Sequence, residues 1–279
     1  MIYQYSYVTE SSFLPAVEWH FFKLRALPCE NEFQHVRRTS LTIHPFCELR
    51  HNLDGQGNAV QWGCICEEHD AFRVVSEGEV VQERLYALHE SPAPYYLAAT
   101  QLTQWNEKMQ QEARQIIASV QSAHSRDAQP VLPPWGGRRG PLSLAESLMH
   151  YVYNYLTYTP LHTTTATTAL DVYQDPRGVC QDYAHLLIAL CRSVGVHARY
   201  ANGFIAGEGQ THAWVEVSDG QVWLPFDPTH DIIPQWGYVK IAHGRDASDC
   251  PTNRGRFYSW TSEQQSARVI LRLAEGSHA

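Results

Sequence analysis

The strongest constraint on the fold of this 279-residue chain is one stretch that is apolar on every side. The stretch lies within residues 179–194, and its apolar members are Ala184, Leu186, Leu187, Ile188, Ala189 and Leu190. A helix without a polar face has to be covered by other elements all the way round. We therefore expect a helix here that forms the buried centre of a domain.

A cysteine stands where this predicted helix begins. Cys180 follows a turn at residues 176–179 that contains proline and glycine. The backbone N–H groups in the first turn of a helix are unpaired and carry partial positive charge, so a thiol placed there loses its proton more easily. Most free cysteines are buried and unreactive, and Cys191 on the same helix fits that description. The position of Cys180 instead predicts a nucleophile.

A predicted β-hairpin downstream supplies a base and a carboxylate. Residues 218–221 read Ser-Asp-Gly-Gln, and the Asp-Gly pair is favoured in two-residue turns. If the first and last of these four residues pair, His212 falls opposite Asp227, with Cβ atoms about 4.5–5.5 Å apart. At that distance a carboxylate accepts a hydrogen bond from an imidazole and holds its tautomer. Together with Cys180, these are the parts that thiol-based acyl transfer needs.

Two features leave the register of this hairpin open. Pro225 has no N–H to give to the ladder, so a bulge is plausible at that point. A three-residue loop with a bulged Gly220 would instead shift the pairing by one residue and turn Asp227 to the other face, unless a second bulge restored it. The pairing of His212 with Asp227 is therefore an expectation that rests on register.

Polar residues near these three have simpler interpretations. Asp182, in the first turn of the helix, fits a favourable partner of the helix dipole. His185 lies five residues after Cys180 and so points about 140° around the helix from it, which suits a packing role. His230 and Asp231 fit an exposed turn better than the rim of a site.

Two further residues are candidates for contact with a substrate. Trp214 lies two residues along the predicted strand from His212, so it shares the same face and would form a wall of the site. Gln181 directly follows the predicted nucleophile.

Composition and charge limit the partners. The net charge is −8 and the 21 basic residues are scattered, which argues against nucleic acid or an anionic membrane surface as a partner. No stretch approaches the roughly 20 apolar residues of a membrane span. Residues 1–5 lack the features of a signal peptide, so we expect a cytoplasmic location.

The cysteines predict neither disulfides nor a metal centre. Seven of them form an odd set with no regular spacing, so free thiols are expected in a chain without an export signal. Cys64 and Cys66, with His69 nearby, do not have the Cys-x-x-Cys spacing of zinc sites, and no second pair accompanies them. We expect no metal and no cofactor.

The chain divides into an N-terminal β domain and a mixed core. Short alternating runs predict antiparallel strands over residues 3–8, 16–24, 34–44 and 71–81, with turn signals at 52–57. We expect residues 1–95 to form an antiparallel, β-sandwich-like domain. Residues 96–250 are the expected core, and residues 251–279 a C-terminal strand segment that packs back on the β domain.

Within the core, helices come before strands, which is typical of the α+β class. Helical spacing predicts helices over residues 100–123 and 142–157, and Ser143 with Glu146 predicts a capping box on the second. Residues 125–141 fit a linker and a loop at the rim of an active site equally well. Strand patterns follow at residues 197–205, 212–218, 221–226, 237–242 and 267–273.

Several segments of the core resemble the bacterial transglutaminase-like family, whose members are regarded as cysteine proteases. They are residues 178–185, 203–204, 211–217 and 226–229, which read GVCQDYAH, GF, THAWVEV and FDPT. Residues 238–246 are similar to the segment that follows the catalytic core in that family, and the β domain has the size that those proteins carry. The resemblance covers nearly the whole chain and is strongest over residues 150–250.

The resemblance implies a papain-like α+β core, with a central helix packed on an antiparallel sheet. It implies that Cys180 is the nucleophile, His212 the base and acid, and Asp227 the orienting group. The expected reaction is hydrolysis of a peptide or glutamine-type amide in a peptide or protein substrate, through a cysteinyl thioester. Two alternatives stay open: a transglutaminase that crosslinks proteins, and an inactive binding or scaffold member of the superfamily.

Overall fold

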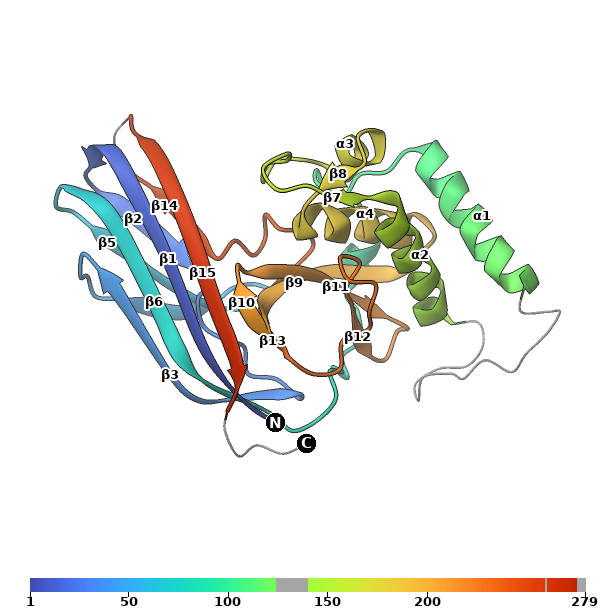
Figure 1. The fold of residues 1–279 in the computed structure, drawn as a ribbon, viewed down its shortest axis with the longest axis horizontal. Coiled ribbons are helices and arrows are strands. Elements are labelled where there is room, and N and C mark those ends of the chain that lie inside the picture. Colours follow the sequence, from blue (N-terminus) through green and yellow to red (C-terminus); the bar gives the residue numbers. More distant parts are fainter. Residues whose placement is uncertain (124–139, 259, 275–279) are drawn as a thin grey trace.

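The computed structural model describes residues 1–123, 140–258 and 260–274, which form two parts lying side by side (Figure 1). Strands from both ends of the chain build the part on the left, and the helices lie in the part on the right. The first part is a β domain and the second a core of helices and antiparallel strands. This confirms the predicted α+β class.

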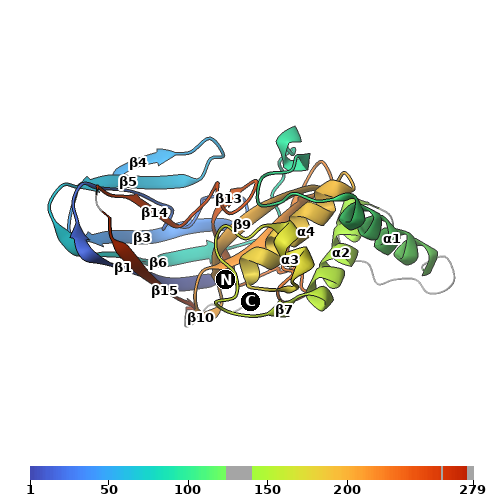
Figure 2. The same ribbon diagram turned by 90° about the horizontal axis from the view of Figure 1, so that it is seen from above.

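The β domain consists of two antiparallel sheets, which Figure 2 shows as separate layers. Their strand orders are β10-β15-β1-β6-β3 and β14-β2-β5-β4. The bounds are β1 Ile2–Val17, β2 His20–Leu24, β3 Gln34–His44, β4 Arg50–Leu53, β5 Ala59–Ile65, β6 His69–Gln82, β10 Gly207–Gly209, β14 Asn253–Arg256 and β15 Ser262–Leu273. The two layers are the β-sandwich-like arrangement that the alternating runs predict.

Strand β1 is longer than the predicted residues 3–8 because its inward positions continue through polar residues. The buried positions alternate along it and are Tyr3, Tyr5, Tyr7, Thr9, Ser11 and Phe13. The hydroxyls of Thr9 and Ser11 donate to groups of β15, at 3.1 and 2.8 Å, so these polar side chains are satisfied inside the sheet. β15 pairs with β1 along the registers from Tyr3 with Leu273 to Leu14 with Ser262.

The core is a four-stranded antiparallel sheet of order β12-β11-β9-β13 packed on helix α4. The bounds are α4 Cys180–Ser193, β9 His197–Ile205, β11 His212–Ser218, β12 Trp223–Phe226 and β13 Tyr238–Gly244. Every residue of α4 from Asp182 to Ser193 is buried, so burial extends beyond the apolar run to four polar residues of the helix. The other face of the sheet is covered by the connection between the two parts, whose Tyr86, Leu88 and Tyr96 pack with Trp214 and Trp223.

Helix α1, Glu107–Ala123, begins later than the predicted residue 100. Asn106 accepts a hydrogen bond from the backbone N–H of Met109 at 2.9 Å, which is the bond that an N-terminal capping residue makes. The prediction placed the start too early because it counted Leu102 as part of the helix. Leu102 is buried, but it lies in the turn before the helix.

Helix α2, Pro141–Tyr155, begins at a proline, which is preset for the first helical position. Ser143 is therefore inside the helix, its hydroxyl donates to the carbonyl of Gly140 at 2.9 Å, and the predicted capping box with Glu146 is wrong. A capping box is instead present at α3 Ala169–Gln174, a short helix that was not predicted from the sequence.

Residues 125–139 of the loop predicted over residues 125–141 lie outside the described part of the chain. None of the described helices is long and apolar enough to cross a membrane.

The two parts of the molecule are joined along the free edge of β13. Buried main-chain groups at a sheet edge need partners. Three buried amide side chains of the β domain supply them in place of a further strand, each donating to a carbonyl and accepting from an N–H. The pairs of distances are 2.8 and 2.8 Å for Gln34 with Lys240, 2.8 and 2.9 Å for Asn58 with His243, and 2.6 and 3.2 Å for Gln82 with Tyr238 and Gly237.

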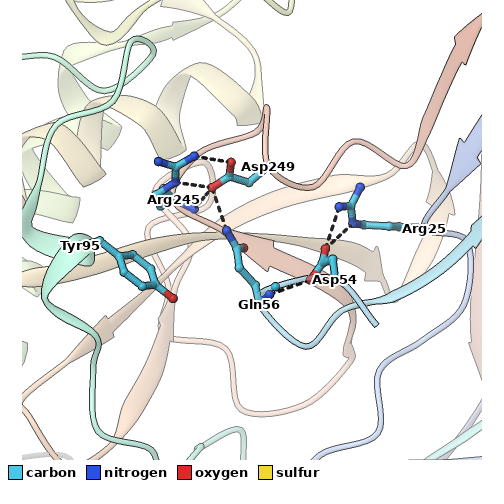
Figure 3. A pocket seen from close by; sticks show the side chains of 7 residues that line it. Arg25, Asp54, Gln56, Tyr95, Arg245 and Asp249 are labelled. Carbon is cyan, nitrogen blue, oxygen red and sulfur yellow. Dashed lines mark hydrogen bonds and ion pairs between the residues drawn. The ribbon is translucent and has the colours of Figure 1, made fainter. Parts of the chain in front are cut away.

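A cavity of about 420 Å³ opens beside this junction (Figure 3). It is lined by Arg25, Asp54, Gly55, Gln56, Tyr95, Arg245 and Asp249. Arg25 pairs with Asp54 and Arg245 with Asp249, each at 2.7 Å. Gln56 lies between the two pairs in Figure 3 and donates to Asp249 at 2.9 Å. The charges that line the cavity are therefore neutralised in pairs, and the cavity belongs to the contact between the two parts.

Replacement of Gln34 or Gln82 by leucine tests the junction. Each change leaves main-chain groups of β13 buried without partners, and we expect each to lower the free energy of unfolding by about 1–3 kcal/mol in urea denaturation. Gln4→Leu, on the exposed face of β1, is the matched control and should change it by less than about 0.5 kcal/mol. Equal effects at the junction and at Gln4 would contradict the role given to the amides.

Candidate active site

Cys180 is the first residue of α4, and a short parallel strand pair precedes it. β7 Thr157–Tyr158 pairs with β8 Arg177–Gly178, and the N–H of Thr159 donates to the carbonyl of Gly178 at 2.9 Å. The side chain of Cys180 is partly exposed, while the helix behind it is buried. Cys180 thus lies at the edge of the core, with part of the residue open to solvent.

Asp182 fixes the turn on which Cys180 lies. Its Oδ2 accepts from the N–H of Val179 at 2.8 Å and from the hydroxyl of Thr163 at 2.6 Å. A Cβ atom on Gly178 would stand 2.5 Å from that oxygen, so a side chain at position 178 would displace the carboxyl group. Burial raises the pKa of Asp182. Its role is structural, at the first turn of the helix.

The hairpin that carries His212 and Asp227 has another register than the predicted one. The strands separate at residues 219–222, so the loop has four residues and the predicted two-residue turn is wrong. The Asp219 side chain closes the loop by accepting two backbone N–H bonds, at 3.0 and 3.1 Å. The pairing is shifted by two residues, which keeps every side chain on its face. His212 and Asp227 therefore still meet, although they are not directly opposed.

The carboxylate of Asp227 is the centre of the site and is fully buried. Its Oδ2 accepts from Nε2 of His212 at 2.7 Å, from Nδ1 of His230 at 2.7 Å and from the hydroxyl of Tyr238 at 2.6 Å. Its Oδ1 accepts from the backbone N–H groups of Thr229 and His230, at 2.8 and 3.3 Å. Burial works against the charge, but these donors lower the pKa of Asp227 well below its usual range. An ionised carboxylate only accepts, so both imidazoles present an N–H to it.

His212 is oriented by this carboxylate. Its Nε2 donates to Asp227, which leaves Nδ1 as the ring nitrogen available to the neighbouring Cys180. Burial alone would lower the pKa of His212, but the bonds and charges of Asp227 and Cys180 raise it to about 10. The imidazolium is therefore the favoured form at neutral pH, and it holds a proton that it can give to a leaving group.

A buried polar network supports the hairpin behind the imidazole. Trp214 donates from Nε1 to the hydroxyl of Tyr86 at 3.1 Å, and that hydroxyl donates to Glu216 at 2.6 Å. Glu216 also pairs with Arg199 and with Nζ of Lys240, at 2.5 and 2.7 Å, and all three side chains are buried. Burial opposes the charge of Glu216, but the two cations lower its pKa well below the usual range.

The residues predicted to contact substrate lie in different places. Trp214 has no exposed surface, so the prediction that it walls an open site is wrong: the connection between the two parts covers its face of the sheet. Gln181 is partly exposed on the first turn of α4, and its role stays a prediction. Tyr158, which the sequence analysis did not select, is half exposed beside Cys180; burial and the neighbouring thiol raise its pKa.

His230 and Tyr238 are the site residues that the sequence analysis missed. His230 was expected in an exposed turn, and its ring is half exposed, but Nδ1 bonds to Asp227. Backbone bonds between Asp227 and Ile232, at 2.9 and 3.3 Å, close the loop that carries it. The only signal for His230 was its place three residues after the carboxylate. Tyr238 reaches the same carboxylate from β13, and no local pattern marks it.

The other candidates lie outside this cluster. His185 is buried within α4, and its Nε2 accepts a backbone N–H at 3.2 Å. Nε2 of His69 lies 3.2 Å from Nδ1 of the buried His20, a contact that does not involve the cysteines. The sulfurs of Cys64 and Cys66 are 3.8 Å apart, and all seven cysteines are free, as predicted.

Among the described residues, the group whose donor atoms are placed to hold a metal ion is His212, Asp227 and His230, with those atoms within 4.8 Å of one another. Two imidazole nitrogens and a carboxylate oxygen are ligands that zinc uses. The expectation of no metal rested on cysteine spacing, which does not bear on this group. The hairpin brings His212 and Asp227 together, and the loop after it adds His230.

The geometry defines a class of protein. An α+β core presents a thiol at the start of its central helix, beside an imidazole that a buried carboxylate orients, which is an arrangement that thiol-dependent enzymes use. The chain belongs to the bacterial transglutaminase-like family. The model of the transglutaminase-like superfamily matches residues 132–228, and that of the bacterial transglutaminase-like N-terminal region matches residues 3–81. The resemblance seen in the sequence is thereby confirmed.

Similar proteins occur in mycobacteria and in Cytophaga. The uncharacterised protein Rv2569c of Mycobacterium tuberculosis is 27% identical over 248 residues, covering 78% of this chain and 76% of its own length. ML0607 of Mycobacterium leprae is 34% identical over 110 residues, 36% of this chain and 39% of that protein. The crystal structure of a "putative cysteine protease" from Cytophaga hutchinsonii has a TM-score of 0.74 at 22% identity, covering 99% of this chain and 92% of that one, and so shares the fold.

Neutralising Glu216 tests the network behind the imidazole. Glu216→Gln leaves Arg199 and Lys240 buried without their carboxylate, and we expect the free energy of unfolding at pH 7 to fall by about 3–5 kcal/mol. Because the pKa of Glu216 is lower in the folded state, its contribution is present above the pKa of the unfolded chain, about 4.3, and is lost as the pH falls further. The difference between wild type and variant should therefore narrow below about pH 4.

The measurement is urea denaturation of both proteins between pH 3.5 and 7. Glu10→Gln is the control, because the ion pair of Glu10 with Arg73 is exposed and contributes about 0–1 kcal/mol. A Glu216→Gln protein as stable as the Glu10→Gln protein would show that the buried carboxylate does not stabilise the core.

Proposed function

We propose that this protein is a thiol-dependent acyl-transfer enzyme that hydrolyses peptide or glutamine-type amide bonds through a thioester on Cys180. The observation that carries the proposal is the 2.7 Å bond from Nε2 of His212 to the buried Asp227, which leaves the other ring nitrogen to the thiol. Family membership supports the thiol-dependent class. The description of the Cytophaga hutchinsonii protein supports the choice of an amide bond.

In the first half of the reaction, the thiolate of Cys180 attacks the amide carbonyl carbon. A carbon–sulfur bond forms, and the carbonyl electron pair moves to the oxygen. The backbone N–H of Cys180, at the unpaired start of α4, is placed to donate to that oxyanion. The carbon–nitrogen bond then breaks as the His212 imidazolium transfers its proton to the leaving nitrogen, which departs as an amine or as ammonia and leaves a thioester.

In the second half, water replaces the leaving group. Neutral His212 takes a proton from the water as its oxygen attacks the thioester carbonyl. The carbon–sulfur bond breaks, the thiolate of Cys180 is restored beside the imidazolium, and the carboxylic acid is released. Asp227 holds the imidazole in one orientation through both halves, because its contact is with Nε2 and not with the nitrogen that moves the proton.

Tyr158 and Gln181 are the proposed contacts for the substrate. Both lie beside Cys180 on the partly exposed side of the helix start, and Tyr158 is 53% exposed. An exposed aromatic ring next to a nucleophile offers apolar area to a peptide segment. These two positions support a peptide or a protein as the substrate class.

Alkylation by iodoacetamide tests the nucleophile. Near pH 6, Cys180 should react at least about tenfold faster than the exposed Cys66, because only Cys180 has an imidazolium partner that favours the thiolate. Rates are read by mass spectrometry of the separate peptides. His212→Ala should bring Cys180 to the rate of Cys66, whereas Cys66 should keep its own rate.

Circular dichroism and the unfolding midpoint establish that the His212→Ala protein is folded, and Asp227→Asn provides a second, less disruptive change with the same expected direction. If Cys180 in the wild-type protein reacts no faster than Cys66, the enzymatic proposal is wrong and the inactive scaffold of the superfamily is the better description.

The fate of the acyl group separates hydrolysis from crosslinking. A glutamine-containing peptide is incubated with the protein, with and without a primary amine in excess, and the acyl product is identified by mass spectrometry. We expect the free acid in both cases. Incorporation of the amine into the peptide would show that the thioester is resolved by transfer and would make the protein a transglutaminase. Cys180→Ser is the control and should form neither product.

A further inference from the structure

The acyl-transfer reaction gives no part to His230, yet this residue occupies a particular place in the site. Its Nδ1 and Nε2 of His212 both lie 2.7 Å from the same oxygen of Asp227. The two rings are tilted against each other with centroids 5.1 Å apart. His230 has 47% of its side chain exposed, whereas His212 is 8% and Asp227 0% exposed. The buried pair is thus reached from outside past one histidine.

The three donor atoms form a set that suits a borderline divalent cation. Nε2 of His212, Oδ2 of Asp227 and Nδ1 of His230 lie within 4.8 Å of one another. Zinc binds histidine nitrogen at about 2.0–2.1 Å and carboxylate oxygen at about 2.0–2.2 Å, and many zinc sites have three protein ligands with water in the fourth position. In a tetrahedron, ligand atoms at these bond lengths stand about 3.3 Å apart, so binding requires each of the two 2.7 Å nitrogen–oxygen contacts to open by less than an ångström, with movement of both rings.

We propose that His212, Asp227 and His230 form an inhibitory binding site for Zn²⁺ or a similar borderline cation, entered past the half-exposed ring of His230. On binding, the N–H proton at Nε2 of His212 and the one at Nδ1 of His230 are released or move to the other ring nitrogen. The oxygen of Asp227 exchanges its hydrogen bonds from the two rings for one bond to the metal. The thiol of Cys180 takes no part, because it does not belong to this group of donor atoms.

Occupancy of this site stops the thiol chemistry through the tautomer of His212. A neutral imidazole bound to a metal at Nε2 carries its single proton on Nδ1. That nitrogen can then donate to Cys180 but cannot accept a proton from the thiol or from the attacking water. This consequence rests on the proposed function of His212 as base, whereas metal binding itself does not.

The binding test uses protein without the nucleophile. Zn²⁺ is titrated into the Cys180→Ser protein in competition with a chromophoric chelator, and the Cys180→Ser protein that also carries His230→Asn is the matched control. Both keep the other six thiols, so a difference between them reports on His230 alone. We expect at least about a tenfold loss of affinity for the tightest site. Mg²⁺, which prefers oxygen ligands, should not compete.

Cobalt identifies the ligands. Co²⁺ bound to the Cys180→Ser protein should give visible d–d bands of a four-coordinate site, and these bands should be absent with His230→Asn. Equal Zn²⁺ affinity in the two proteins, or cobalt spectra that do not change on loss of His230, would overturn the site. Both readouts are made on a protein that cannot react, so they are independent of whether the proposed hydrolysis occurs.

The regulatory consequence is measured on the intact protein. Zn²⁺ at saturation should slow iodoacetamide labelling of Cys180 at least about tenfold, the loss expected when the imidazole no longer favours the thiolate. The same Zn²⁺ concentration should leave the labelling of Cys180 unaffected in the His230→Asn protein. Slowing of equal size in both proteins would mean that zinc acts through the thiol itself, and would refute inhibition through His212.

Discussion

The buried carboxylate of Asp227 is the interaction on which the arrangement of the site depends. A charge without solvent is tolerated only when hydrogen bonds replace its hydration. Here the donors come from three parts of the chain: His212 at the start of β11, Tyr238 at the start of β13, and the loop after β12, with its backbone N–H groups and His230. None of them can be displaced without leaving the carboxylate partly unsatisfied, so the charge ties the ends of three strands together.

The β domain contributes to this arrangement through the backbone of β13. Gln82 bonds to the carbonyl of Tyr238 and to the N–H of the preceding Gly237, so it holds the residue whose hydroxyl reaches Asp227. Gln34 bonds in the same way to the carbonyl and the N–H of Lys240, two residues further along the strand. An edge strand completed by side-chain amides has a fixed position without the need for a further strand. The domain that carries no candidate nucleophile therefore helps to set the geometry around it.

The central helix and the His–Asp contact could be predicted because they depend on residues close together in the sequence. Features that depend on residues far apart in the sequence could not be predicted. The apolar run predicts α4 because its burial follows from its own composition. The hairpin register was wrong by two residues because Asp219 closes a four-residue loop with its side chain, which the Asp-Gly pair does not reveal. The contact of His212 with Asp227 survived that error because strand faces repeat every two residues. Tyr238 and the cover over Trp214 depend on tertiary packing, which no local pattern contains.

The convergence of donors on Oδ2 of Asp227 has opposite consequences for protons and for metal ions. With protons on both rings, each N–H donates to Asp227 and lowers its pKa, so the carboxylate stays ionised. The imidazole of His212 then keeps its orientation toward the thiol. A cation that replaces those protons uses the same three atoms and the same alignment, but it fixes the proton on the nitrogen that has to accept one. His230 is the residue that separates the two cases, because a dyad of His212 and Asp227 alone offers a metal only two ligands. His230 supplies the third ligand from the loop after β12, and its partly exposed ring is the ligand that solvent reaches.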